Sequence, residues 1–201
     1  PPGGAGCASA VARGGSGMTG LSIVYPHQDY RNIQPDPWTI RSLGPGCWVR
    51  RVFMGNLYNG VDFATHDNDR HVLERVCGSA LNRAFLLGNS ANIGWVDNCQ
   101  VRPQDWAWAS RRDLQVDVPG DQYAKPQFKD VVRGAEYCLV PNLHGAGAIT
   151  IGSGANVQVC GVFVNGPTRA FDFIDHAGKG GGNARIWLGG SEAGWGAWVK
   201  Q

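Results

Sequence analysis

Two stretches of the chain share one pattern, and this pattern decides the fold. Residues 84–93 read Ala-Phe-Leu-Leu-Gly-Asn-Ser-Ala-Asn-Ile, and residues 148–157 read Ala-Ile-Thr-Ile-Gly-Ser-Gly-Ala-Asn-Val. Each stretch is a short apolar run, a turn of small residues, then Ala-Asn and a new apolar run. They align without gaps at an offset of 64 residues, which is close to three repeats of about 21 residues.

Shorter pieces of the same unit lie between and beside these stretches. Arg-Ala-Phe at 83–85 recurs at 169–171, and further apolar segments follow the turns. The pattern indicates a strand, a tight turn, a second strand and a wider loop, repeated every 21–27 residues. Because no helix-length amphipathic segment separates the strands, the coil itself has to carry the chain from one parallel strand to the next.

This pattern predicts an all-β protein, a right-handed parallel β-helix of roughly seven to eight coils. Successive coils of such a solenoid stack about 4.8 Å apart, with apolar columns inside and polar columns outside. Asn92 and Asn156 suit left-handed corners, where their amides can bond to the next coil. Equal spacings of 22 residues separate Cys77 from Cys99 and Cys138 from Cys160. Stacking therefore allows either disulfides or a column of buried thiols.

Composition agrees with this class and excludes others. Of 201 residues, 30 are Gly, 13 are Asp against 3 Glu, and 12 are Asn, so the polar residues favour turns over helices. Hydrophobic residues make up 43% of the chain, enough for a sizeable core. The net charge of +2 argues against a nucleic-acid binder. No apolar run reaches the ~18 residues that a membrane helix needs.

The coils are expected over residues 18–188, with a long excursion at 103–130. Residues 1–17 are rich in Gly, Ala, Ser and Pro and are predicted to be irregular, and residues 189–201 to cover the end of the solenoid. The chain starts Pro-Pro-Gly-Gly and lacks an amphipathic N-terminal helix that could cap an open end. We therefore expect it to be a fragment of a longer chain or to have lost a leader.

Residues 20–28, Gly-Leu-Ser-Ile-Val-Tyr-Pro-His-Gln, with Trp-Thr-Ile at 38–40 and the coil repeats, resemble the right-handed parallel β-helix proteins of the pectin-lyase-like superfamily. Its members include polysaccharide lyases, glycoside hydrolases, epimerases, phage tailspikes and adhesins. The resemblance implies a protein that is secreted or at the cell surface, with a polysaccharide as its partner. It does not carry over a catalytic motif, because Leu-His-Gly at 143–145 matches only part of a Gly-His-Gly motif of the polygalacturonase branch.

Aspartates supply the candidate catalytic groups. The corner 66–71 reads His-Asp-Asn-Asp-Arg-His, so Asp67 and Asp69 could bind calcium or act as acid and base, or form a solvated turn. Asp97 lies in a predicted strand. Glycoside hydrolysis needs two carboxyl groups ~5–9.5 Å apart, and stacked coils could pair Asp97 with Asp62. The alternative for Asp97 is a surface side chain bonded to a backbone amide.

The excursion 103–130 is the candidate binding segment, because long excursions from compact domains are often functional. It gathers side chains that stack on sugars or pair with anions: Trp106, Trp108, Arg111, Arg112, Lys125 and Lys129. Asp105 is a further catalytic candidate beside them. Alternatively, the tryptophans pack the excursion onto the coils and the charges are solvated. The histidines at 27, 144 and 176 are scattered, and we expect them to be structural.

These observations together predict a carbohydrate-active β-helix, a glycoside hydrolase or polysaccharide lyase, with its substrate in a groove along the coils. The alternative is a noncatalytic β-helix that serves as a spike, adhesin or filament subunit. We expect no cofactor, and calcium at the corner 66–71 is the alternative. We expect neither nucleic-acid binding nor membrane insertion, while association into a homo-oligomer or with the remainder of a longer chain stays open.

Overall fold

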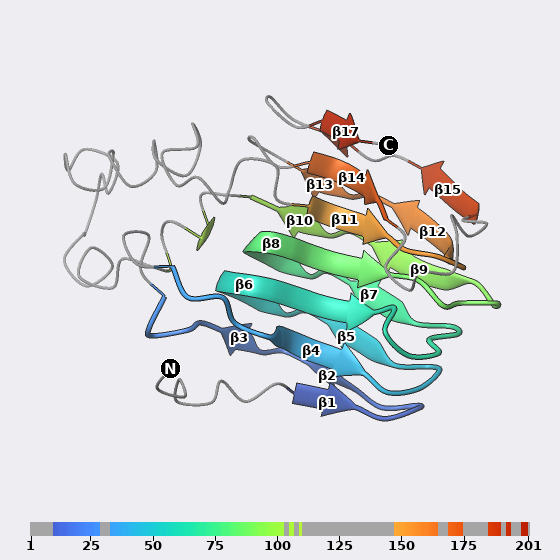
Figure 1. The fold of residues 1–201 in the computed structure, drawn as a ribbon, viewed down its shortest axis with the longest axis horizontal. Helices are drawn as coiled ribbons and strands as arrows, with labels where there is room; N and C mark the ends of the chain where they lie inside the picture. The colour runs from blue at the N-terminus through green and yellow to red at the C-terminus, as the bar shows by residue number, and fades with distance from the viewer. Residues whose placement is uncertain are drawn as a thin grey trace.

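Two parallel sheets wind around one core in the computed structural model. The structure describes residues 10–28, 33–102, 105, 106, 109, 147–164, 169–174, 185–189, 192, 193 and 198–200. Every strand pair among them is parallel, and each strand pairs with its counterpart in the next coil (Figure 1). The prediction of an all-β parallel β-helix is confirmed.

Sheet B has six strands, and it forms one side of the solenoid. In spatial order they are β2 (Gly17–Thr19), β5 (Trp48–Arg50), β7 (Val72–Glu74), β9 (Gly94–Asp97), β12 (Asn156–Cys160) and β15 (Arg185–Gly189). Burial alternates along β5, β7, β9 and β12, because successive side chains of a strand point to opposite faces. The inner column of Val49, Leu73, Val96 and Val159 is at most 1% exposed.

Sheet A has eleven strands and wraps the rest of the core. Its main rungs are β1 (Ala10–Ala12), β4 (Trp38–Ser42), β6 (Phe53–Phe63), β8 (Cys77–Leu87), β11 (Gly147–Ile151), β14 (Arg169–Phe173) and β17 (Trp198–Lys200). Four short strands extend the same sheet: β3 (Ser22–Ile23), β10 (Gln100–Val101), β13 (Phe163–Val164) and β16 (Glu192–Ala193). The long β6 and β8 pair with both groups because each has 11 residues: its first residues pair with a short strand and its later residues with a main rung.

The register corrects the repeat count that the sequence predicted. Phe85 lies directly beside Ile149, and β8 pairs with β11. The offset of 64 residues therefore separates two adjacent rungs, and the interpretation as three stacked units was wrong. Sheet A contains seven main rungs in the described part of the chain. The coils also start earlier than expected, since β1 lies inside the segment 1–17.

A column of residues with positive φ turns the chain from sheet B into sheet A. One such residue follows each of five strands of sheet B, with φ between 51° and 70°: Gly20, Arg51, Arg75, Asn98 and Gly161. The backbone N–H of each donates to the carbonyl that ends the neighbouring strand, over 2.9–3.2 Å. The parallel hydrogen-bond ladder thus continues around the corner without a break.

The asparagine corners differ from the prediction in backbone conformation. Positive φ occurs at Asn89 and Asn98, whereas Asn92 and Asn156 are not among the described residues that adopt it. Their amides nevertheless bond between coils as expected. Nδ2 of Asn92 donates to Asp69 over 2.7 Å, and Nδ2 of Asn156 donates to the carbonyl of Ala91 over 3.0 Å.

The cysteines of the described coils are free thiols. Gln100 lies opposite Cys77, so Cys99 is one residue out of register with it. A shift of one residue moves a side chain to the other face of a strand. Cys99 is therefore buried while Cys77 is partly exposed, and the disulfide alternative for this pair was wrong. Cys160 is also free, and Cys138 lies outside the described residues.

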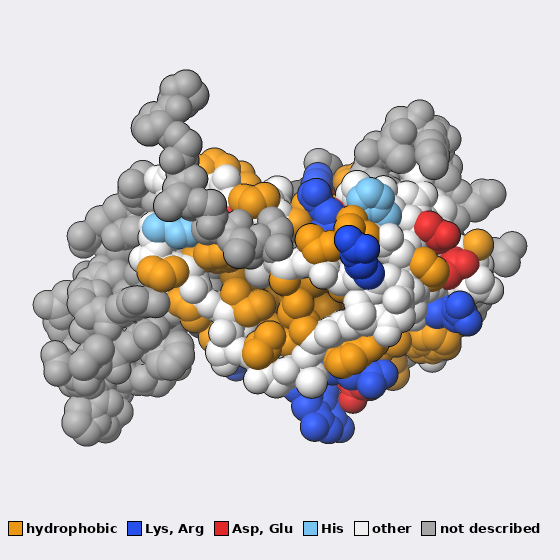
Figure 2. All heavy atoms as spheres, turned by 90° about the horizontal axis from the view of Figure 1, so that it is seen from below, with side chains coloured by type: hydrophobic (Ala, Val, Ile, Leu, Met, Phe, Trp, Pro, Cys, Tyr) orange, Lys and Arg blue, Asp and Glu red, His pale blue; other side chains and the backbone are white. Residues whose placement is uncertain are grey.

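The end of the solenoid near β1 exposes more apolar surface than the interior rungs. Val11, Leu21 and Leu43 are 54%, 48% and 42% exposed, and Figure 2 shows hydrophobic side chains gathered on this end. Interior core residues such as Ile40 and Val61 are fully buried. No helix among the described residues has the length and apolar character required to cross a bilayer.

We predict that the corner column tolerates glycine and rejects β-branched residues. Arg51 has φ 51° and no ion pair among the described residues. Arg51→Val should destabilise the fold by about 1–2 kcal/mol, because left-handed backbone crowds a side-chain Cβ and a branched one most. Arg51→Gly should change stability by less than about 0.5 kcal/mol, since relief of strain offsets the added chain entropy. Denaturant unfolding measures both, and equal losses for the two variants would contradict the role of φ.

Candidate functional site

The outer face of sheet B brings together side chains that the sequence places far apart. One column runs Arg50, Glu74, Asp97 and Cys160 along four adjacent strands. Asp97, a predicted catalytic residue, is exposed here. Its register neighbour is Glu74, whose carboxylate forms an ion pair with Nε of Arg50 at 3.2 Å and lies 4.0 Å from Nε of Arg75.

Glu74, rather than Asp62, is the acidic neighbour of Asp97. Asp62 lies on β6 of sheet A and is fully buried. Its carboxylate accepts from Nε of Arg41 at 3.1 Å and from the hydroxyl of Thr65 at 2.6 Å. The proposed pairing of Asp62 with Asp97 was therefore wrong, because the two residues belong to different sheets.

A second column of sheet B, two residues from the first, carries tryptophan. Trp48, Val72, Trp95 and Gln158 are in register on consecutive strands. Trp95 is 38% exposed, and the guanidinium of Arg50 lies 5.3 Å from the ring centroid of Trp48. Aromatic and charged side chains thus stand side by side on one open face. Sequence reasoning missed this set, because the residues share a face only after the register is known.

The described part of the excursion packs against the coils. Trp106 is fully buried and its indole N–H donates to the carbonyl of Leu57 over 3.1 Å. The backbone is helical at Asp105 and Trp106. Trp106 cannot stack on a ligand in this position, and its predicted binding role is corrected. Trp108, Arg111 and Arg112 lie outside the described residues.

Asp105 is tied to its own turn. Its two carboxylate oxygens accept from Arg102 at 2.8 and 3.0 Å. Burial raises the pKa of Asp105 above the usual value, while the hydrogen bonds and the charge of Arg102 act in the opposite direction. Its catalytic role stays a prediction.

The two aspartates of the corner 66–71 differ in their surroundings: Asp69 is hydrogen-bonded to the next coil and Asp67 is exposed. Asp69 accepts from the backbone N–H of Asn92 at 2.8 Å and from its amide at 2.7 Å, and these bonds lower the pKa of Asp69. Both oxygens therefore join this coil to the next. Asp67 is exposed and lines a shallow hollow of about 600 Å³ with Thr65 and Asn89. Within the described ranges, no three His, Cys, Asp or Glu side chains group as metal ligands do.

A buried histidine lies at the same corner. His71 is fully buried, its Nδ1 is 2.7 Å from the carbonyl oxygen of Asn68, and its ring packs against Phe63. A Cβ at Gly94 would lie 2.3 Å from this ring, so the next coil has glycine where the imidazole needs room. Burial lowers the pKa of His71 to about 4, because the imidazolium would lose its hydration.

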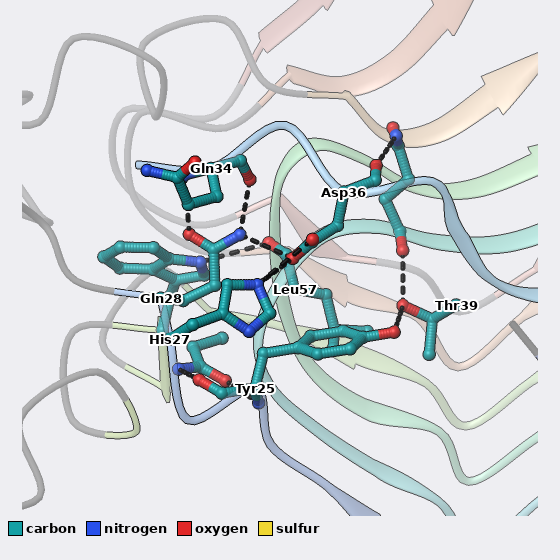
Figure 3. A network of polar contacts seen from close by, with 10 residues as sticks. Tyr25, His27, Gln28, Gln34, Asp36, Thr39 and Leu57 are labelled. Carbon is teal, nitrogen blue, oxygen red and sulfur yellow. Dashed lines mark hydrogen bonds and ion pairs between the residues drawn. The ribbon is translucent and has the colours of Figure 1, made fainter. Parts of the chain in front are cut away.

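A polar network closes the loop between β3 and β4 (Figure 3). Nε2 of His27 lies 2.9 and 3.1 Å from the two oxygens of Asp36. The side chain of Gln28 donates to Asp36 at 2.7 Å and to the carbonyl of Gln34 at 2.5 Å. Gln28 is almost completely buried, so the network ties both ends of the loop to one side chain. This supports the structural role expected for His27.

Comparisons with known proteins add no identity: neither a protein-family model, nor a curated protein, nor a solved structure matches the chain.

We predict that His71 makes stability depend on pH. The unfolded histidine binds a proton near pH 6.5, whereas the folded one does so only near pH 4. The contribution of the neutral His71 to the free energy of unfolding is therefore complete above pH 6.5. It is lost as pH falls toward 4, at about 1 kcal/mol per pH unit. Denaturant unfolding between pH 7 and 4 measures the slope. His71→Leu should make the free energy of unfolding less dependent on pH between 7 and 4. An unchanged pH dependence in this variant would contradict the role of His71.

Proposed function

We propose that the protein binds a polysaccharide on the outer face of sheet B without needing to cleave it. The observation that carries this proposal is the tryptophan column of Trp48 and Trp95 standing beside the charged column of Arg50, Glu74 and Asp97. Indole rings stack on the apolar C–H faces of sugars, and charged groups of both signs hydrogen-bond sugar hydroxyls. An open face built of repeated strands suits an extended polymer better than a small molecule.

The fold also supports polysaccharide binding. A parallel β-helix with a bound polysaccharide agrees with the resemblance to the pectin-lyase-like superfamily, to which we propose the chain belongs. In this proposal the protein works outside the cell or at its surface, where such polymers occur. The noncatalytic role is preferred because the tryptophan face is open, while the predicted groove residue Trp106 is buried.

Cleavage of the polysaccharide is the second candidate, and one observation favours it. Glu74 and Asp97 are directly opposite on adjacent strands of sheet B. Neighbouring strands lie about 4.8 Å apart, close to the ~5–5.5 Å that separates the carboxyl groups of retaining glycosidases. In that case one carboxyl group would protonate the leaving oxygen while the other attacked the anomeric carbon.

We predict that Trp95→Ala weakens binding to polysaccharide about 10-fold, since one stacked ring contributes up to about 1.5 kcal/mol. Phe173→Ala is the matched control: Phe173 is 39% exposed against 38% for Trp95 but lies on sheet A. Affinity electrophoresis in gels that contain soluble polysaccharides compares the two variants with the parent protein. Equal losses in both would refute a site on sheet B.

For cleavage, the expected result is that Glu74→Gln and Asp97→Asn each abolish release of reducing ends while polysaccharide binding persists. Reducing-end assays on plant, algal and bacterial polysaccharides provide the measurement, and absorbance of unsaturated products separates a lyase from a hydrolase. Cleavage that persists in both variants would show that Glu74 and Asp97 are not the catalytic carboxylates.

A further inference from the structure

The tryptophans of sheet B recur with a period of two rungs. The register aligns one position on all six strands: Gly17, Trp48, Val72, Trp95, Gln158 and Trp187. Tryptophan thus occupies the second, fourth and sixth rungs of this column. Along the chain the intervals are 47 and 92 residues, so the regularity exists only in the stacked structure.

The rung spacing sets the distance between these positions. Adjacent strands lie about 4.8 Å apart, so Trp48 and Trp95, which stand on alternate rungs, are about 10 Å apart. Val49 and Val96, the next residues along their strands, are buried in the core, which puts Trp48 and Trp95 on the outer face. The ring of Trp48 lies over the preceding rung, where a Cβ on Gly17 would be 2.4–2.7 Å from its ring carbons.

A two-rung period matches one class of polymer. In an extended chain of β-1,4-linked pyranoses, each sugar is turned over relative to the last, so every second sugar presents the same face. The repeat of such a chain is close to the two-rung step of about 10 Å. We propose, building on the polysaccharide-binding function above, that the ladder formed by Trp48 and Trp95 binds an extended β-1,4-linked chain parallel to the solenoid axis, with alternate sugars on the two rings.

The neighbouring charges indicate a neutral chain. Asp97, which forms no ion pair among the described residues, stands beside the ladder and would repel the carboxylates of a polyuronate. Arg50, the basic member of this column, is already held by Glu74 at 3.2 Å. Its guanidinium covers part of Trp48, but its side chain is 45% exposed. Exposed contacts of this kind contribute up to ~1 kcal/mol. A stacking sugar can therefore displace the Arg50 guanidinium from the Trp48 ring.

Calorimetric titration of the full chain with defined oligosaccharides tests the proposal. Cellohexaose and chitohexaose should bind at least ~10-fold more tightly than maltohexaose, whose α-linkages curve the chain, or polygalacturonate. Affinity should rise from the disaccharide to the trisaccharide, whose first and third sugars reach both tryptophans, and change little with further length.

Variants at position 95 separate the ladder from the general function. Trp95→Ala should lower hexasaccharide affinity about 10-fold, Trp95→Tyr should retain most of it, and Phe173→Ala should retain all of it. Thermal melting of each variant reports whether the fold is intact. Equal binding of maltohexaose or polygalacturonate overturns the β-1,4 assignment and leaves polysaccharide binding standing. Cellohexaose binding that Trp95→Ala does not change overturns the ladder, and failure to bind any of these saccharides overturns the proposed function as well.

Discussion

The backbone hydrogen bond across the left-handed corner is the constraint on which the rest of the structure depends. Parallel strands are joined by corners, and a corner with unpaired amides would break the ladder at every turn of the chain. Here the corner residues, among them Arg51 and Arg75, accept positive φ and keep donating to the neighbouring coil. The conformational strain at two arginines is offset because each N–H remains paired. Coils of unequal length in sequence therefore stack with equal spacing.

Equal spacing gives the outer face its chemical character. Loops between strands absorb differences in coil length, so residues separated by dozens of positions align in columns. Glu74 lies opposite Asp97, and tryptophans at 48 and 95 stand two rungs apart. The same geometry keeps Asp62 away from them, since it belongs to sheet A and is neutralised by Arg41. A column on a solenoid is thus a regular array of side chains, and the ligand that we propose for it is a regular polymer.

Several predictions from the sequence were correct in kind and wrong in detail for one physical reason. The repeat of 84–93 at 148–157 identified two stacked segments, yet these are direct neighbours because β8 pairs with β11. The interval between Cys77 and Cys99 suggested equivalent positions, but a displacement of one residue turned one thiol inward. Trp106 carried the expected chemistry of a sugar platform, and its indole instead binds the carbonyl of Leu57 inside the protein. The periodicity of a strand depends on residues that are close together in the sequence. The register between strands, and whether another segment covers a face of the sheet, depend on residues that are far apart in it.

The amino-acid sequence by itself determined the class of structure: apolar runs of strand length, abundant turn residues and the absence of helical periodicity leave stacked parallel coils as the way to bury the core. It also determined which residue types could meet a ligand. Only the tertiary structure decided which of them share a face. The partners of Asp97, the burial of Trp106 and the two-rung spacing of tryptophans all depend on hydrogen-bond register between coils, and the lengths of the intervening loops leave that register open in the sequence.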